Sequence, residues 1–214
     1  MRFRDRIEAG EALAERLAKI GYSGSPTIVL GIPRGGVLLA DIVAKRLGAD
    51  LDIVIPRKLG APDNEELAIG AVMDDGTSYI NKYIVNALRI PEDFIEKEKA
   101  KQAAEIKRRS TAYRKQDIKY NIKGRRAILV DDGVATGATV IASARWLRKQ
   151  NPSNLVVAVP VAPSQSAQLL EQEADSILVL YMPENFGSVG QFYEEFNPVS
   201  DAHVMKITKA RGLL

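Results

Sequence analysis

Short apolar runs alternate with amphipathic stretches along this 214-residue chain, and that alternation restricts the possible folds more than any other feature. The runs Thr27–Gly31, 51–55 and 127–130 have the length of buried strands, while 37–47 and 138–149 have helical spacing. Strands that alternate with helices connect by right-handed crossovers and build a mainly parallel sheet with helices on both faces. The sequence therefore predicts a doubly wound α/β fold.

The rest of the chain extends the same pattern. Further strands are predicted at 67–73, 77–80, 155–160 and 176–181, and further helices at 4–20, from Pro91 onward and at 164–173. The first helix is expected to bury a side that carries Phe3, Ile7, Ala14 and Leu17. The polar stretch 57–66 contains Gly60 and Pro62, so it is predicted to be a loop.

The composition excludes several kinds of chemistry. The chain has no cysteine and a single histidine, His203, so it forms no disulfide, thiolate metal site or paired-histidine zinc site. No apolar run is long enough to cross a bilayer, and the charged N-terminus lacks the apolar core of a signal peptide. We expect a soluble, cytoplasmic protein whose chemistry comes from carboxylates, basic groups, hydroxyls, backbone amides and a hard cation.

The basic residues are unevenly distributed. The net charge of +3 is too small to indicate a nucleic-acid partner, yet segment 97–126 has a local excess of nine positive charges. Ion pairs within the helix, such as Lys101 with Glu105 and Glu105 with Arg109, favour an ordinary solvated helix. A basic face that binds RNA is the alternative, although only Tyr113 and Tyr120 interrupt the charges.

The segment from Ile128 to Thr139 carries the chemistry. An apolar strand ends at Asp131 and Asp132, and a loop of small residues then leads into a helix, which is where open α/β sheets bind ligands. The two carboxylates can accept hydrogen bonds from vicinal sugar hydroxyls and help place a hydrated divalent cation. Backbone amides at the helix start can bind a phosphate, and the loop that would hold it consists of Ala135, Thr136, Gly137, Ala138 and Thr139.

This segment resembles the phosphoribosyl-diphosphate motif of type I phosphoribosyltransferases, and the alternation around it is similar to that family from about 27 to 181. The resemblance implies that loop 135–139 binds the 5-phosphate of 5-phosphoribosyl 1-diphosphate (PRPP). It also implies that Asp131 and Asp132 bind the ribose hydroxyls, and that Mg²⁺ bridges the diphosphate, with water between the metal and the two carboxylates. Taken alone, the same residues would be a strand-ending turn and a helix cap.

Two further segments are similar to diphosphate-binding parts of that family. Pro33, Arg34, Gly35 and Gly36 follow the first strand, as does a family loop in which the peptide bond before the basic residue is often cis; a helix-entry turn with a surface arginine is the alternative. Arg57 and Lys58 look like the catalytic basic pair, followed by a loop, 60–67, that would close over the diphosphate. Cations at these places would stabilise the departing diphosphate.

The acceptor is expected in a hood formed by residues 1–24 and 182–214, on a core of about 25–181. Residues 182–190, with Tyr193 and Phe196, faintly resemble the purine-contacting tail of hypoxanthine-guanine phosphoribosyltransferases. Phe186 and Val189 are expected to form that surface, although packing between hood and core explains Phe186 equally well. Ala135 stands where 6-oxopurine enzymes carry an aspartate base, and Gln172 or Glu173 where they carry a lysine. The acceptor therefore stays open.

The resemblance implies a magnesium-dependent transferase of nucleotide metabolism, a homodimer, which moves a phosphoribosyl group from PRPP to a small nitrogenous acceptor that can be a nucleobase. The alternative is a regulatory protein on the same fold that senses PRPP or a nucleotide or binds RNA. A PRPP synthetase is disfavoured because the chain shows no second nucleotide-binding segment.

Overall fold

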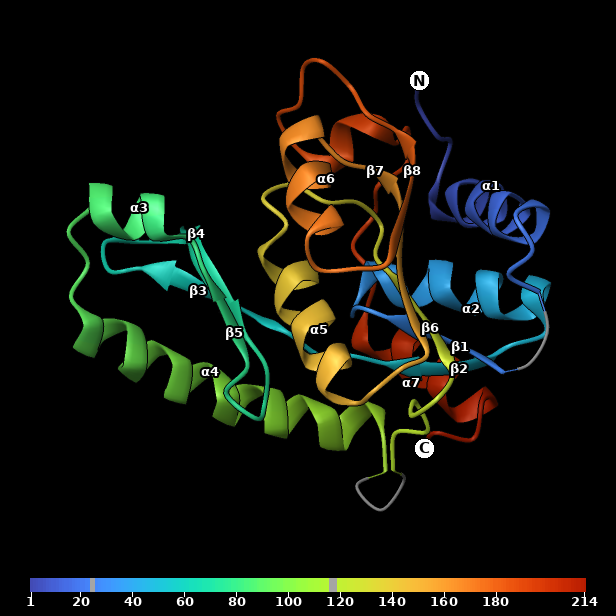
Figure 1. Ribbon diagram of the computed structural model, residues 1–214, viewed down its shortest axis with the longest axis horizontal. Helices are drawn as coiled ribbons and strands as arrows, with labels where there is room; N and C mark the ends of the chain where they lie inside the picture. The colour runs from blue at the N-terminus through green and yellow to red at the C-terminus, as the bar shows by residue number, and fades with distance from the viewer. Residues whose placement is uncertain (24–25, 116–118) are drawn as a thin grey trace.

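The computed structural model describes residues 1–23, 26–115 and 119–214. Its centre is a five-stranded parallel sheet in the order β2-β1-β6-β7-β8 (Figure 1). The strands are β1 (Thr27–Gly31), β2 (Asp50–Ile53), β6 (Arg126–Val130), β7 (Asn154–Val161) and β8 (Ser176–Tyr181). The predicted α/β class and the five predicted strands of this sheet are confirmed.

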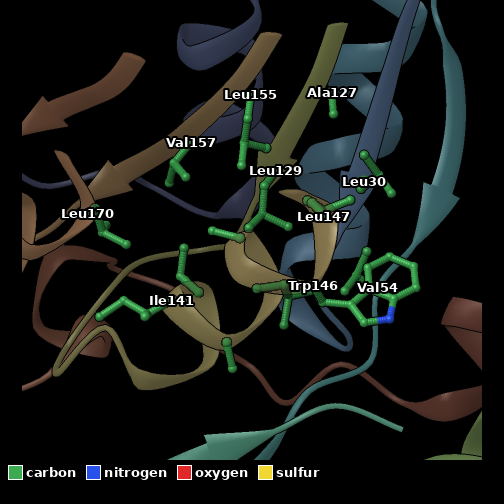
Figure 2. Close-up of a cluster of buried hydrophobic side chains, with 14 of the residues drawn as sticks. Leu30, Val54, Ala127, Leu129, Ile141, Trp146, Leu147, Leu155, Val157 and Leu170 are labelled. Atoms are coloured by element: carbon green, nitrogen blue, oxygen red, sulfur yellow. The ribbon is translucent and has the colours of Figure 1, made fainter. Parts of the chain in front are cut away.

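Helices cover both faces of this sheet. Helices α1 (Arg6–Lys19) and α2 (Gly35–Leu47) lie on one face, and α5 (Ala138–Lys149) and α6 (Ser164–Glu171) lie on the other (Figure 1). Strand alternation supplies both cores: Ile128 and Val130 of β6 pack with α1 and α2, whereas Leu129 packs with α5. Figure 2 shows the second core, where Leu129, Leu155 and Val157 meet Ile141 and Leu147.

The first helix buries most of the predicted side, because Phe3, Ala14 and Leu17 are buried, and Ile7 is the exception. Asp5 caps it by accepting hydrogen bonds from the amides of Ile7 and Glu8, which turns Ile7 outward with 52% of its surface exposed. The buried residues of α1 are Ala9, Gly10, Leu13, Ala14 and Leu17. Contact with α2 sets this rotation, because a β-carbon on Gly10 would lie 2.9 Å from the Ile42 side chain.

The stretch 57–66 is not the predicted loop. It forms most of an antiparallel hairpin, in which β3 (Arg57–Ala61) pairs with β4 (Asn64–Val72), and β5 (Ser78–Ile80) pairs with β4 on its other side. Backbone pairing and the burial of Leu59 and Ala61 stabilise β3, so its polar neighbours do not prevent a strand. Residues 60–67, which were expected to form a loop that closes over the diphosphate, therefore belong mostly to paired strands.

Two helices accompany the hairpin. The six-residue α3 (Lys82–Ala87) follows β5, and the long α4 (Glu92–Tyr113) begins after Pro91 as predicted. Figure 1 shows the hairpin, α3 and the first half of α4 extending away from the parallel sheet. Ile95 and Ile106 of α4 pack on Leu59 and Ile69 of the hairpin. None of the helices in the described ranges combines the length and apolarity that crossing a membrane requires.

The two ends of the chain meet beside the parallel sheet. Phe3 forms a parallel bridge with Tyr193, just after a 3₁₀ turn, η1 (Val189–Phe192), and the Glu194 amide donates to the Phe3 carbonyl at 2.8 Å. The last helix, α7 (Asp201–Ala210), packs against α2 and α4. The sequence predicted neither α7 nor α3. The division into core and hood stays a prediction.

One buried ion pair joins the end of α4 to the parallel sheet. The Arg114 guanidinium donates to both carboxylate oxygens of Asp52, at 2.9 and 3.1 Å, and stacks over the ring of Tyr120. Both charged side chains are less than a tenth exposed. Removing one partner would leave the other charge buried and unpaired.

We therefore expect Arg114→Leu to lower the free energy of unfolding by about 3–5 kcal/mol in urea titrations. Lys19→Ala removes an exposed pair with Glu15 and should change stability far less, because exposed ion pairs contribute little. The double variant Arg114→Leu/Asp52→Leu should recover much of the loss. A cost for Arg114→Leu no larger than for Lys19→Ala would contradict a buried pair.

Candidate functional site

A cavity of about 370 Å³ opens at the carboxyl ends of β1 and β6. Ile32, Pro33, Arg34 and Gly35 line it from the loop after β1, and residues 131–137 with Thr139 and Val140 line it from the segment after β6. The remaining lining residues come from elsewhere in the chain, namely Arg6, Lys58, Val189, Phe196, Pro198 and Val199. This is the edge of the sheet where parallel α/β folds bind ligands.

Asp131 and Asp132 form the acidic side of the cavity. Burial and the neighbouring charge of Asp132 raise the pKa of Asp131 well above its usual range, against the opposing effect of Lys58. Burial also raises the pKa of Asp132, although the Arg6 guanidinium opposes this at 2.7 Å from the carboxylate. Within the described ranges, no lysine or arginine forms an ion pair with Asp131. The negative charge of Asp131 is therefore the less favourable of the two in the folded protein.

Glycines let the loop after β1 lie against the acidic pair. A β-carbon on Gly35 would lie 1.8 Å from the Asp132 carboxylate, and one on Gly36 would lie 2.7 Å from the Val130 carbonyl. The contact of Gly36 is with backbone, so position 36 requires glycine, whereas a side chain at position 35 would displace the Asp132 carboxylate from its place beside Arg6. The Pro33–Arg34 peptide bond is cis. The structure thus brings the predicted loop 33–36 directly beside Asp131 and Asp132.

The small-residue loop leads into the N-terminus of α5. Gly137 has φ of +83°, a left-handed conformation that favours glycine, and no side chain caps the helix. Ala135 and Thr136 are exposed at the cavity, and the Ser166 hydroxyl donates to the Ala135 carbonyl and holds the loop. The first amides of α5 are free of partners within the helix, which suits an anion at this place.

The structure separates the two residues of the predicted basic pair. Lys58 lines the cavity, whereas Arg57 points to α4 and donates to the Gln102 side chain at 2.9 Å. Neighbouring residues of a strand face opposite ways, so only one member of a pair on β3 can face the cavity. Burial lowers the pKa of Arg57, with the charge of Arg109 adding to this effect. The structure therefore brings Lys58, and not Arg57, to the cavity, and a role of Arg57 at the diphosphate stays a prediction.

Of the two residues predicted to contact the acceptor, the structure places only one at the cavity. Val189 lines the cavity, but Phe186 stacks on Phe192 with ring centroids 5.3 Å apart and lies outside the lining. The aromatic ring at the cavity is Phe196, against which the Arg6 guanidinium lies at 3.8 Å. Sequence reasoning placed Phe196 in the tail but did not choose it for the acceptor surface. It missed Arg6, Pro198 and Val199, because nothing local marks residues from opposite chain ends as neighbours.

The oxygen donors suit a hard divalent cation such as Mg²⁺. Two adjacent carboxylates line the cavity, and one of them has no cationic partner among the described residues. The same residues contain no group of three or more His, Asp or Glu side chains that could hold a metal alone. Magnesium commonly binds through one or two carboxylates together with substrate phosphates and water, so the residues present fit it in that way.

Three comparisons relate the chain to known proteins. The family described as "Phosphoribosyl transferase domain" matches residues 4–85 and 65–196. Two Mycobacterium tuberculosis proteins, named "Putative phosphoribosyl transferase MT0597" and "Putative phosphoribosyl transferase Rv0571c", are each 39% identical over 203 residues. These matches cover 95% of this chain but 45% of each relative, so the chain spans about half the length of the curated relatives it matches.

Solved structures show the same relationship in three dimensions. The crystal structure of TT1426 from Thermus thermophilus matches with a TM-score of 0.80 and 44% identity, covering 97% of this chain and 98% of that one. The AQ2163 protein from Aquifex aeolicus matches with a TM-score of 0.52 and 14% identity, covering 86% of this chain and 78% of that one. The second similarity shows a shared fold alone.

The raised pKa of Asp131 predicts that this carboxylate destabilises the free protein. Asp131→Asn keeps an oxygen that can accept the Asp132 amide, bonded at 2.9 Å, but removes the partly buried charge. We expect the variant to be more stable at pH 7 by about 1 kcal/mol in thermal or urea unfolding. Because the folded-state pKa is raised, the wild type regains stability relative to the variant as the pH falls through that pKa.

Asp175→Asn provides a control of opposite sign. Arg148 lowers the pKa of Asp175, so this substitution should destabilise the protein at pH 7, and its cost should shrink only as the pH falls below the unfolded-state pKa and through the lower folded-state pKa. Destabilisation by both substitutions at pH 7 would show that Asp131 is not held as a strained charge.

Proposed function

The chain belongs to the phosphoribosyl transferase family, and from this premise we propose that it transfers the 5-phosphoribosyl group of PRPP to a nitrogenous acceptor. In this reaction the bond between ribose C1 and the diphosphate oxygen breaks, a bond between C1 and an acceptor nitrogen forms, and diphosphate leaves. The observation that carries the proposal is the meeting of three segments, namely the acidic pair, the α5 N-terminus and the loop 33–36, in one cavity.

The α5 end of the cavity suits the 5-phosphate of the donor. Free backbone amides and the hydroxyls of Thr136 and Thr139 provide several donors at the start of a helix, where the helix dipole also favours a negative charge. Gly137 lets the backbone approach the phosphate closely. Asp131 and Asp132 then lie between this end and the loop 33–36, where carboxylate oxygens can accept hydrogen bonds from the ribose 2- and 3-hydroxyls.

The opposite end of the cavity suits the diphosphate. Arg34 and Lys58 are its cations, and Mg²⁺, held through Asp131 or Asp132 and water, would neutralise further charge on the diphosphate oxygens. As the C1–O bond breaks, positive charge grows on the ribose and negative charge grows on the departing oxygens. The acidic pair would stabilise the positive charge on the ribose, and Arg34 and Lys58 would stabilise the negative charge on the departing diphosphate.

The acceptor is proposed to enter beside Val189 and Phe196. These side chains, with Pro198 and Val199, form the apolar part of the cavity, and Arg6 covers one face of the Phe196 ring. An apolar, aromatic wall suits a planar nitrogen heterocycle such as a nucleobase. Phe186 is then a packing residue. The expected homodimer and cytoplasmic location stay predictions.

The basic pair provides a sharp kinetic test. Lys58→Ala removes a cation from the cavity and should lower the turnover rate by roughly 10²-fold, the effect of losing one group that stabilises developing charge. Arg57→Ala should have a smaller effect, because its side chain reaches Gln102 and influences the cavity only through the hairpin. Turnover is measured as diphosphate released from PRPP and Mg²⁺ in a screen of purines, pyrimidines and simple amines.

Lys82→Ala, on the outlying helix α3, is the control and should retain wild-type turnover. Larger losses from Arg57→Ala than from Lys58→Ala would contradict the assignment of Lys58 to the diphosphate. PRPP binding without diphosphate release for any acceptor would favour a regulatory protein on the same fold.

A further inference from the structure

Most of the basic residues in segment 97–126 have a partner in the structure. Arg108 and Arg109 share Glu105, and Lys101 approaches Glu98 and Glu65 instead of the predicted Glu105. Lys97, Lys99, Arg114 and Arg125 pair with Asp93, Glu96, Asp52 and Asp50, and Arg126 lies over the ring of Tyr22. The remaining lysines are 107, 115, 119 and 123, and no carboxylate of residues 1–23, 26–115 and 119–214 lies within ion-pair distance of them.

Lys107, Lys115 and Lys119 line one cavity of about 820 Å³, which we call the lysine cavity. It lies along α4 and beside Arg114, Lys115, Lys119 and Tyr120, and Gln150 at the end of α5 also lines it. We call the cavity at the carboxyl ends of β1 and β6 the donor cavity. Among the described residues, none that lines the donor cavity also lines the lysine cavity. The lysines without carboxylate partners thus gather at a second hollow instead of scattering over the surface.

The lysine cavity has an architectural basis. Ala103, Lys107 and Ser110 are spaced by four and three residues, so they lie along one side of α4, next to the side that buries Ile106. The small side chains of Ala103 and Ala104 leave room beside the helix. The buried pair of Arg114 with Asp52, and Tyr120 packed on Trp146, form a rigid end wall.

The charges indicate which ligand would fit. Arg114 is neutralised by Asp52, so the lining residues that the structure describes present three lysine ammonium groups against one carboxylate, Asp74. Ammonium groups are compact charges with three donors each, and they bind phosphate oxygens well. The volume is that of a ligand pocket for a small molecule and exceeds the need of a single phosphate. A ligand with several linked phosphates would satisfy both the charge and the volume.

We propose that the lysine cavity binds a small polyphosphate-bearing ligand, of the class of nucleoside triphosphates or inorganic polyphosphate. The site is separate from the donor cavity, so ligand and PRPP can be bound together. The proposal does not depend on the transferase activity, because it rests on the lysines and the cavity alone.

The test is calorimetric titration of the full chain with sodium tripolyphosphate and, separately, with ATP. The variant Lys107→Glu/Lys119→Glu should weaken binding by about tenfold or more, because two attractive contacts become repulsive. The matched control is Lys97→Glu/Lys123→Glu, which changes the net charge equally at exposed lysines outside the cavity. We expect its affinity to stay within about twofold of the wild type, since exposed charges at a distance are screened by salt.

Lys58→Ala separates this site from the donor cavity and should leave tripolyphosphate affinity unchanged. Tighter binding of ATP than of tripolyphosphate supports a nucleotide ligand, and equal binding supports recognition of the phosphates alone. The proposal is overturned by equal weakening in both charge-reversal variants, by loss of binding in Lys58→Ala, or by binding of a short single-stranded RNA without either small ligand.

Discussion

The close contact between the loop after β1 and the carboxylates after β6 is the constraint on which the site depends. Gly35 and Gly36 have no room for a side chain, because Asp132 and the end of β6 occupy that space. The contact sets two neighbouring strands of the sheet to end at one place, with anionic groups on one and a basic loop on the other. The remaining parts of the cavity are arranged around this junction.

The junction has an electrostatic cost in the free protein. Asp131 and Asp132 lie side by side in a recess. Loss of hydration raises the pKa of both carboxyl groups, and repulsion by the charge of Asp132 raises the pKa of Asp131 further. Arg6 relieves part of this cost at Asp132, from the far end of the chain. Strained charges in a cleft are typical of groups arranged for a ligand, and here sugar hydroxyls and a divalent cation would complete their interactions.

Local sequence patterns were enough to predict the position of those segments that lie directly between a strand and a helix. The acidic pair, the loop 135–139 and the loop 33–36 each follow an apolar strand and precede a helix, so strand, turn and helix signals suffice to place them at one sheet edge. The hairpin was missed because strand pairing, not residue type, stabilises 57–66. Because 57–66 was predicted to be a loop, the sequence could not show that Lys58 and Arg57 lie on opposite faces of a strand, with Lys58 toward the cavity.

Contacts between distant parts of the chain could not be predicted from one sequence. Arg6 meets Asp132 across 126 residues, and an isolated parallel bridge between Phe3 and Tyr193 holds the segment of Phe196 beside the start of the chain. Neither residue lies in a motif, and each is ordinary for a surface helix or a loop. The residues of the proposed donor side can therefore be predicted from the sequence, whereas those of the proposed acceptor side depend on how the chain ends pack.

The most direct test of this account is a crystal structure of the protein with PRPP and Mg²⁺. The account predicts the 5-phosphate on the amides of residues 135–139, the ribose hydroxyls on Asp131 and Asp132, and the diphosphate beside Arg34 and Lys58. A donor bound in the reverse direction, or outside this cavity, would contradict it.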